Sequence, residues 1–374
     1  MPAIRASESE YTGFLIRLTP HNPTIESCPL PRRIAPPARL AHLGAAALAI
    51  LLFSACSSHL VDTPSPTIDP ARAAESPPAT AKPAGVVLPL AGAAQAAAFD
   101  ARTGSLVVLG AGNRPTVTVF SSMGAATPTQ LGGIATAMAG DNDGTAYLST
   151  KGGYFRFDIA SGEATRVGVE GLDGVDVTAI ARRADGRLVL GSADGTVYTL
   201  SSDATIGARL RIFARVDAIV TQGNTAVVLD RGQTSVTTLN SDGTKPEQAL
   251  RAGRGATTMA ADTAGRVLVA DTRGGELLVY GVDPLILRQR FPVPDSPYGL
   301  AASGTPTGLV WVTQTEINTV IGYDLATGIP VEKVRYRTVQ QPNTLAFDDT
   351  SGTLYVVSGA GAGLQVIDSA GAPK

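Results

Sequence analysis

The chain has 374 residues, 44% of them hydrophobic, and its 30 Lys and Arg nearly balance its 32 Asp and Glu, which gives a net charge of −2. This balance excludes the basic footprint of a nucleic-acid-binding protein. The two cysteines and three histidines all lie before residue 60, so the sequence that follows has no disulfide and no imidazole or thiolate chemistry.

The first informative element is an apolar run at residues 40–55, preceded by Arg32, Arg33 and Arg39. It is shorter than the ~20 apolar residues that a helix needs to span a bilayer. A basic flank followed by a short apolar run is typical of a secretory signal peptide. We therefore expect residues 1–55 to be a leader and the rest of the chain to be exported.

The end of this run resembles a bacterial lipobox, in which a cysteine thiol is acylated and becomes the new N-terminus. Ser54 and Ala55 are the small residues expected before Cys56, whereas Phe53 departs from the usual Leu or Val. The resemblance implies a lipoprotein anchored by diacylglycerol and palmitate-type chains on the outer surface of the cell membrane, because two acyl chains anchor stably. The alternative is an ordinary signal peptide cut nearby, with Cys56 unmodified.

Residues 56–84 are rich in Pro, Ala, Ser and Thr and nearly free of bulky apolar side chains. Such a segment buries too little surface to offset the entropy of ordering it. We expect a disordered tether between the lipid anchor and the folded domain.

Seven near-copies of one short apolar strand follow, spaced 38 to 44 residues apart. They begin at Ser105, Thr145, Arg187, Thr225, Arg266, Leu309 and Thr353. Each is preceded by a small-residue strand and a turn signal such as Asp143-Gly144, and followed by a third strand and, in most units, a weaker fourth. Several strands per unit and no helix are typical of a β-propeller, whereas a β-helix has shorter turns and a β-sandwich does not repeat one motif seven times.

The two ends of the repeat region complement each other. The last unit stops after its third strand, and one spare strand at residues 86–91 precedes the first unit. Pairing the two would leave no open sheet edge. The sequence thus predicts an all-β, seven-bladed propeller over residues 85–374, with the N-terminal strand completing the last blade.

Individual units resemble known repeats. Asp262, Gly265 and the strand that starts at Arg266 are similar to the NHL repeat, and Tyr355 to Ser358 with the following QVID is similar to the YVTN repeat. Lipid-anchored propellers with this layout are familiar from actinobacteria. The resemblance implies the fold and says little about activity.

A candidate ligand face lies on the loops after the main strands and on those leading into each blade. Its members are Asp230, Arg231, Arg251, Arg254, Asp271, Arg273, Tyr298, Trp311 and Gln314. The arginine guanidinium forms bidentate hydrogen bonds with a carboxylate or phosphate, and an exposed aromatic ring stacks on a sugar. The structural alternative is that the aspartates cap turns, the arginines pair with them and Trp311 belongs to the core.

Without His or Cys, the propeller lacks the usual nucleophile and base pairs. Asp141-Asn142-Asp143-Gly144 resembles part of a Ca²⁺ loop, but it lacks the distal Glu and coincides with a hairpin tip. We predict a monomeric, non-catalytic binding or scaffolding propeller without cofactor or metal, whose partner is a protein, peptide or glycan. The alternatives are a Ca²⁺-dependent, carboxylate-based hydrolase or lactonase, and an accessory component of a transporter.

Overall fold

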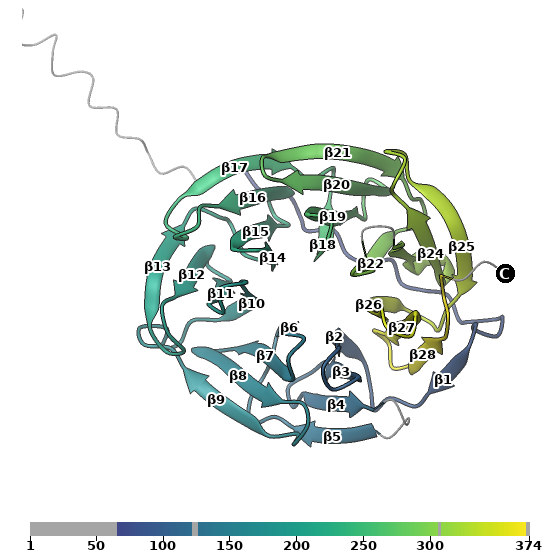
Figure 1. Ribbon diagram of the computed structural model, residues 1–374, viewed down its shortest axis with the longest axis horizontal. Coiled ribbons are helices and arrows are strands. Elements are labelled where there is room, and N and C mark those ends of the chain that lie inside the picture. Colours follow the sequence, from purple (N-terminus) through teal and green to yellow (C-terminus); the bar gives the residue numbers. More distant parts are fainter. Residues whose placement is uncertain (1–65, 122–125, 306–307, 372–374) are drawn as a thin grey trace, which may run out of the picture. The chain divides into compact units, whose positions relative to one another are not determined.

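A computed structural model describes residues 66–121, 126–305 and 308–371. Seven four-stranded antiparallel sheets surround a central channel, with the innermost strand of each sheet at the channel and the outermost at the rim (Figure 1). The predicted seven-bladed, all-β propeller is confirmed. The expected leader and Cys56 lie outside the described residues.

The blades follow one another in chain order. Blade 1 contains β2 (Ala94–Asp100), β3 (Ser105–Gly110), β4 (Thr116–Phe120) and β5 (Ala126–Gln130), and blade 2 contains β6 (Met138–Gly140), β7 (Thr145–Thr150), β8 (Gly153–Asp158) and β9 (Ala164–Gly168). Blade 3 contains β10 (Val177–Arg182), β11 (Leu188–Ser192), β12 (Thr196–Leu200) and β13 (Ile206–Arg211), and blade 4 contains β14 (Ala218–Gln222), β15 (Thr225–Asp230), β16 (Ser235–Leu239) and β17 (Pro246–Arg251). Blade 5 contains β18 (Ala256–Ala261), β19 (Arg266–Asp271), β20 (Glu276–Val282) and β21 (Leu285–Pro292), and blade 6 contains β22 (Pro297–Ala302), β23 (Val310–Gln314), the 3₁₀ turn η1 (Thr315–Ile317), β24 (Thr319–Asp324) and β25 (Val331–Arg337). Blade 7 contains β26 (Pro342–Asp348), β27 (Thr353–Ser358), β28 (Leu364–Ile367) and β1 (Val86–Leu88).

The seven repeated apolar strands are the second strands of the blades, and they are buried on both faces because each sheet is packed between two others. In β19, for example, all four residues from Val267 to Ala270 are completely buried. The hairpin before such a strand turns on a glycine, as at Gly144, where φ is 89°. An L side chain rarely adopts this conformation, which is why the turn signal recurs.

The hydrophobic core lies between blades. One cluster joins Val107 and Leu109 of blade 1 to Leu148 and Phe157 of blade 2. Between blades 6 and 7, Trp311 packs with Tyr336 and Leu354. Each interface thus buries apolar side chains from two consecutive repeats, and no blade has a core of its own.

The ring is closed by β1, as the sequence predicted. This strand pairs antiparallel with β28 in the register Val86↔Val366 to Leu88↔Leu364. The buried Gln365 side chain reinforces the closure, because its Nε2 donates to the carbonyls of Ala84 at 2.7 Å and Arg337 at 2.9 Å. Its Oε1 accepts from Val339 N at 3.0 Å.

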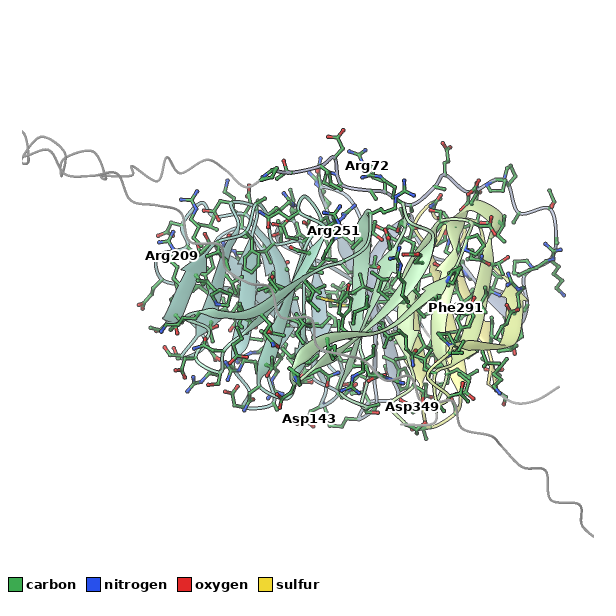
Figure 2. All side chains as sticks on the ribbon, turned by 90° about the horizontal axis from the view of Figure 1, so that it is seen from above. Arg72, Asp143, Arg209, Arg251, Phe291 and Asp349 are labelled. Carbon is green, nitrogen blue, oxygen red and sulfur yellow. The ribbon has the colours of Figure 1, made fainter. Side chains whose placement is uncertain are left out.

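Residues 66–84, which we call the strap, differ from the expected tether. The strap crosses blades 4 to 7 toward β1 (Figure 1) and lies on the side of the propeller where Figure 2 labels Arg72. Ile68 N donates to Gly232 O at 2.7 Å at one end, and Ala84 N donates to Arg337 O at 3.1 Å at the other. Low apolar content prevents the segment from forming its own core, but its backbone groups still bind to a preformed surface.

Among the described residues, no helix has the length and apolar character needed to cross a membrane.

We predict that Gln365→Leu destabilises the propeller by about 2–5 kcal/mol, because the Val339 N–H and the Ala84 carbonyl lose their buried partner. The control is Gln130→Leu, on the exposed outer strand β5, where the side chain makes one part-buried hydrogen bond, to Pro115 O at 3.1 Å, so the free energy of unfolding should fall by no more than about 1 kcal/mol. Chemical denaturation measures both. Equal losses in the two variants would contradict a special role of Gln365 in closure.

Candidate functional site

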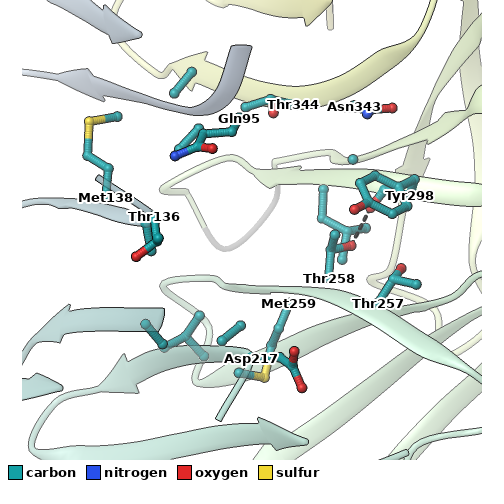
Figure 3. A pocket seen from close by; sticks show the side chains of 18 of the residues that line it. Gln95, Thr136, Met138, Asp217, Thr257, Thr258, Met259, Tyr298, Asn343 and Thr344 are labelled. Atoms are coloured by element: carbon teal, nitrogen blue, oxygen red, sulfur yellow. Dashed lines mark hydrogen bonds between the residues drawn. The ribbon is translucent and has the colours of Figure 1, made fainter. Parts of the chain in front are cut away.

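The central channel opens as a cavity of about 490 Å³ lined by the inner strands of all seven blades. Its wall combines polar side chains with small residues such as Ala96 and Gly299 and with larger apolar ones such as Met138 and Leu300. Polar side chains gather around it in Figure 3, where Gln95, Thr136, Asp217, Tyr298 and Asn343 come from different blades.

Each blade contributes at least one polar residue at or just before the start of its inner strand. These residues, which we call the mouth ring, are Gln95, Thr136, Thr178, Asp217, Thr257, Tyr298 and Asn343. In five blades the strand pairing shifts register at this point, as between Val177 and Ala179 in β10. Such a bulge inserts an unpaired residue and turns its side chain out of the regular alternation.

The mouth ring links neighbouring blades by hydrogen bonds. Gln95 Nε2 donates to Ala135 O at 2.6 Å, and Thr136 Oγ1 donates to Val177 O at 2.6 Å. Thr178 Oγ1 likewise donates to Val216 O at 2.5 Å. Each acceptor immediately precedes the next member of the ring, so the ring connects blades 1 to 4 in sequence.

Asp217 interrupts this pattern because an ionised carboxylate has no hydrogen to donate. Its oxygens accept from Arg231 N at 2.9 Å and from Arg215 Nε at 3.0 Å. The strap joins blades 4 and 5 at this place. Arg231 Nη2 donates to the carbonyl of Ala71, and Arg273 Nη2 donates to that of Asp69 at 2.6 Å.

Asp230 and Asp271 of the candidate ligand face are completely buried and stabilise loops. Asp230 accepts from Ala214 N at 2.7 Å and Gln233 N at 3.0 Å. Asp271 accepts from the backbone amides of Arg254 at 2.8 Å, Gly255 at 2.7 Å and Gly274 at 3.0 Å. These carboxylates are therefore occupied by backbone amides, in agreement with the turn-capping interpretation.

The four candidate arginines fall into two groups. Arg231 and Arg273 hold the strap, and Arg231 also lines the channel. Its buried Nε finds no hydrogen-bond partner among the residues that the structure describes. Arg251 and Arg254 are exposed, and Arg251 Nε donates to Gly253 O at 3.0 Å. The structure thus places positive charge on the strap side of the channel.

Tyr298 lies in the mouth ring, but Trp311 and Gln314 are structural. Trp311 is completely buried and stacks on Tyr336 at a centroid distance of 6.3 Å. Gln314 Nε2 donates to Pro294 O at 2.9 Å, and its Oε1 accepts from Arg335 at 2.8 Å. A hydrogen bond to Glu332 raises the pKa of Arg335.

The described residues contain no group of three or more His, Cys, Asp or Glu that could hold a metal ion. Among the residues that line the channel, Asp217 is the one carboxylate. In the Asp141-Asn142-Asp143-Gly144 turn, Asp141 accepts from the backbone amides of Asp143 at 2.8 Å and Thr145 at 2.9 Å, as a hairpin tip requires. Figure 2 shows Asp143 on the opposite side of the propeller from Arg72.

Sequence reasoning missed most of the mouth ring and all of the strap contacts. The ring had a signal, because the repeats of the inner strand start with a polar residue followed by small or apolar ones, as at Thr136, Thr178 and Thr257. Gln95, Asp217 and Asn343 occupy the same place in other blades. The strap contacts of Ser296, Gln340 and Gln341 had no local signal, since their partners lie more than 200 residues away.

No protein-family model and no curated protein matches the chain. Its fold is similar to a chain in a crystal structure of the mitotic checkpoint complex, with a TM-score of 0.64 and 12% identity over 81% of this chain and 99% of that one. It is also similar to a streptogramin B lyase structure, with a TM-score of 0.61 and 11% identity over 76% of this chain and 96% of that one. At such identities the likeness shows the β-propeller fold, and the resemblance to NHL and YVTN repeats stays a prediction.

We predict that Thr178→Val lowers the free energy of unfolding by about 1–2 kcal/mol, because the methyl group that replaces the hydroxyl leaves Val216 O without this donor. Thr165→Val, on the exposed outer strand β9, is the matched control and should be nearly neutral. Thermal and urea unfolding would compare the two. A neutral Thr178→Val would show that the mouth ring does not join the blades energetically.

Proposed function

We propose that the protein is an exported, lipid-anchored propeller that binds a partner without catalysing a reaction, and that it does so on the face that carries the channel mouth and the strap. The observation that carries the proposal is that polar side chains of the mouth ring are engaged in hydrogen bonds between blades. One polar residue from each blade gathers at one opening, yet Gln95, Thr136 and Thr178 donate to neighbouring backbone carbonyls. A rigid ring of this kind is suited to presenting a surface.

The chemistry of the channel supports binding over catalysis. A hydrolase needs a nucleophile or water activated by a base in reach. Asp217 is already hydrogen-bonded to Arg215 and Arg231, and the sequence holds no histidine beyond residue 59. A single carboxylate with both oxygens in use also falls short of the six to eight oxygen ligands of Ca²⁺. The Ca²⁺-dependent hydrolase is therefore not favoured.

The strap side of the propeller has chemistry that suits a peptide or a glycan. Arg251, at the end of the outer strand β17, and Arg254, in the loop that leads to β18, are exposed on the strap side, and Tyr298 lines the channel. Guanidinium groups bind carboxylates and stack on flat groups, and a tyrosine contributes both a ring and a hydroxyl. The near-neutral charge of the chain gives no support to a nucleic-acid partner.

The anchor is proposed from the sequence around Cys56, where Ser54 and Ala55 precede the thiol. Acylation of this residue would hold the propeller at the outer surface of the cell membrane. No transmembrane helix is needed in such an arrangement.

Cys56→Ala should release the protein from the membrane, because it removes the thiol that carries the acyl chains. Cys28→Ala is the matched control and should leave membrane association unchanged. Detergent-phase partitioning measures the release, and mass spectrometry of the exported protein detects the acyl groups. An unmodified Cys56 in the exported, membrane-free wild-type protein would refute the anchor and leave the binding face untouched.

A photo-crosslinker at Arg251 should capture a partner in intact cell envelopes several times more efficiently than one at Asp143. The two positions are exposed on opposite sides of the propeller (Figure 2), so they are a matched pair. Immunoblotting and mass spectrometry quantify the adducts. Equal or reversed capture would contradict the proposal that the strap side is the binding face.

A further inference from the structure

The strap is held almost entirely through its backbone. Side chains of the propeller donate to six of its carbonyl groups: Arg273 to Asp69, Arg231 to Ala71, Gln341 to Ala74, Gln340 to Ser76, Asn318 to Pro77 and Gln365 to Ala84. Two of its amides bind side chains of the propeller as well, since Ala74 N donates to Ser296 Oγ at 3.0 Å and Ser76 N donates to Gln341 Oε1 at 2.9 Å. Contacts of this kind recognise an extended chain largely without regard to its side chains.

Only two strap side chains are buried, and both are small. Ala71 is 6% exposed and packs at Gly255, where an added Cβ would lie 2.9 Å from the Ala71 Cβ. Ser76 is 4% exposed, and its hydroxyl donates to Thr315 O at 2.5 Å. Arg72 and Glu75 between them are exposed. The surface therefore accepts small residues five positions apart and leaves two of the four intervening side chains exposed, with Ala73 and Ala74 half-buried.

The strap also differs from the strands in how it is held. Residues 66–84 form no β-ladder with any described strand. Their release would break the side-chain contacts and the backbone hydrogen bonds of Ile68 and Ala84, and it would leave the strands of every blade paired. Segments held by partly exposed contacts open at a lower free energy than core strands do. Pro70, Pro77 and Pro78 favour an extended chain before docking, which reduces the entropy lost on binding.

We propose that the surface across blades 4 to 7 is a docking groove for an extended polypeptide, that the strap fills it in cis, and that a partner segment with two small residues spaced like Ala71 and Ser76 replaces the strap. This inference rests on the proposed binding function and names the class of partner. Displacement would also act on the channel, because Arg231 both lines the channel and binds the Ala71 carbonyl.

A tethered occupant has a high effective concentration, so a free peptide competes poorly until the strap is weakened. The test uses the full chain with Ala71→Leu and Ser76→Leu together, since neither larger side chain fits its buried place. The probe is a fluorescent synthetic peptide with the sequence of residues 66–78. In anisotropy titrations we expect it to bind the double variant with a Kd at least roughly tenfold below that for the wild type.

Two controls make the experiment specific. The variant with Arg72→Leu and Glu75→Leu changes exposed strap positions, so its strap should stay docked and exclude the peptide as the wild type does. A peptide carrying the two leucine substitutions should not bind the double variant. Failure of the double variant to bind the 66–78 peptide, with its circular dichroism unchanged, would overturn the proposal, and so would equal binding to both variants.

Hydrogen exchange of the unmodified protein gives a second test that needs no substitution. The amides of Ile68, Ala74 and Ser76 should exchange at least tenfold faster than those in β15 and β19 under native conditions. If these amides exchanged only through global unfolding, the strap would never detach from the folded propeller, and the proposal would be overturned. Neither measurement depends on acylation or on capture at Arg251, so a failure here is distinct from a failure of the proposed function.

Discussion

The apolar contact between neighbouring blades is the interaction on which the structure depends. The second strand of every blade is buried on both faces. Clusters such as Val107 with Leu148 and Phe157 extend over two repeats. A blade at an open end would expose one of these faces and a sheet edge. Closure by β1 against β28 removes both costs at once. The short pairing of three residues therefore has an effect on stability beyond its own hydrogen bonds.

The same radial packing determines what the channel can contain. Seven inner strands converge on the channel, and each brings a polar side chain to it, in five blades beside a bulge. At Thr136 and Thr178 the hydroxyl is used to tie one blade to the next. Polarity at this mouth is thus largely structural in origin, and Tyr298 and the arginines nearby carry the chemistry that remains for a ligand.

The sequence predicted the strands closely and the site poorly, for a physical reason. A strand such as Thr145–Thr150 is specified locally by its apolar residues and the preceding glycine turn. Whether a polar residue at a strand end faces solvent depends on loops from other blades, which local patterns do not encode. Asp271 is buried by its own backbone loop, and Gln314 by contacts with Pro294 and Arg335. Trp311 belongs to an interblade core, as its place within a strand indicated.

The strap shows the limit of reading disorder from composition. Few apolar residues mean that a segment does not fold alone, but the free energy of docking also depends on the surface that receives it. Here the propeller supplies preformed donors from four blades, and it does so beside Asp217, where the ring of interblade donors is interrupted. Arg231 joins the two features, since its backbone amide binds Asp217 and its guanidinium binds the strap. Any partner that displaces the strap would therefore change the one charged sector of the channel mouth.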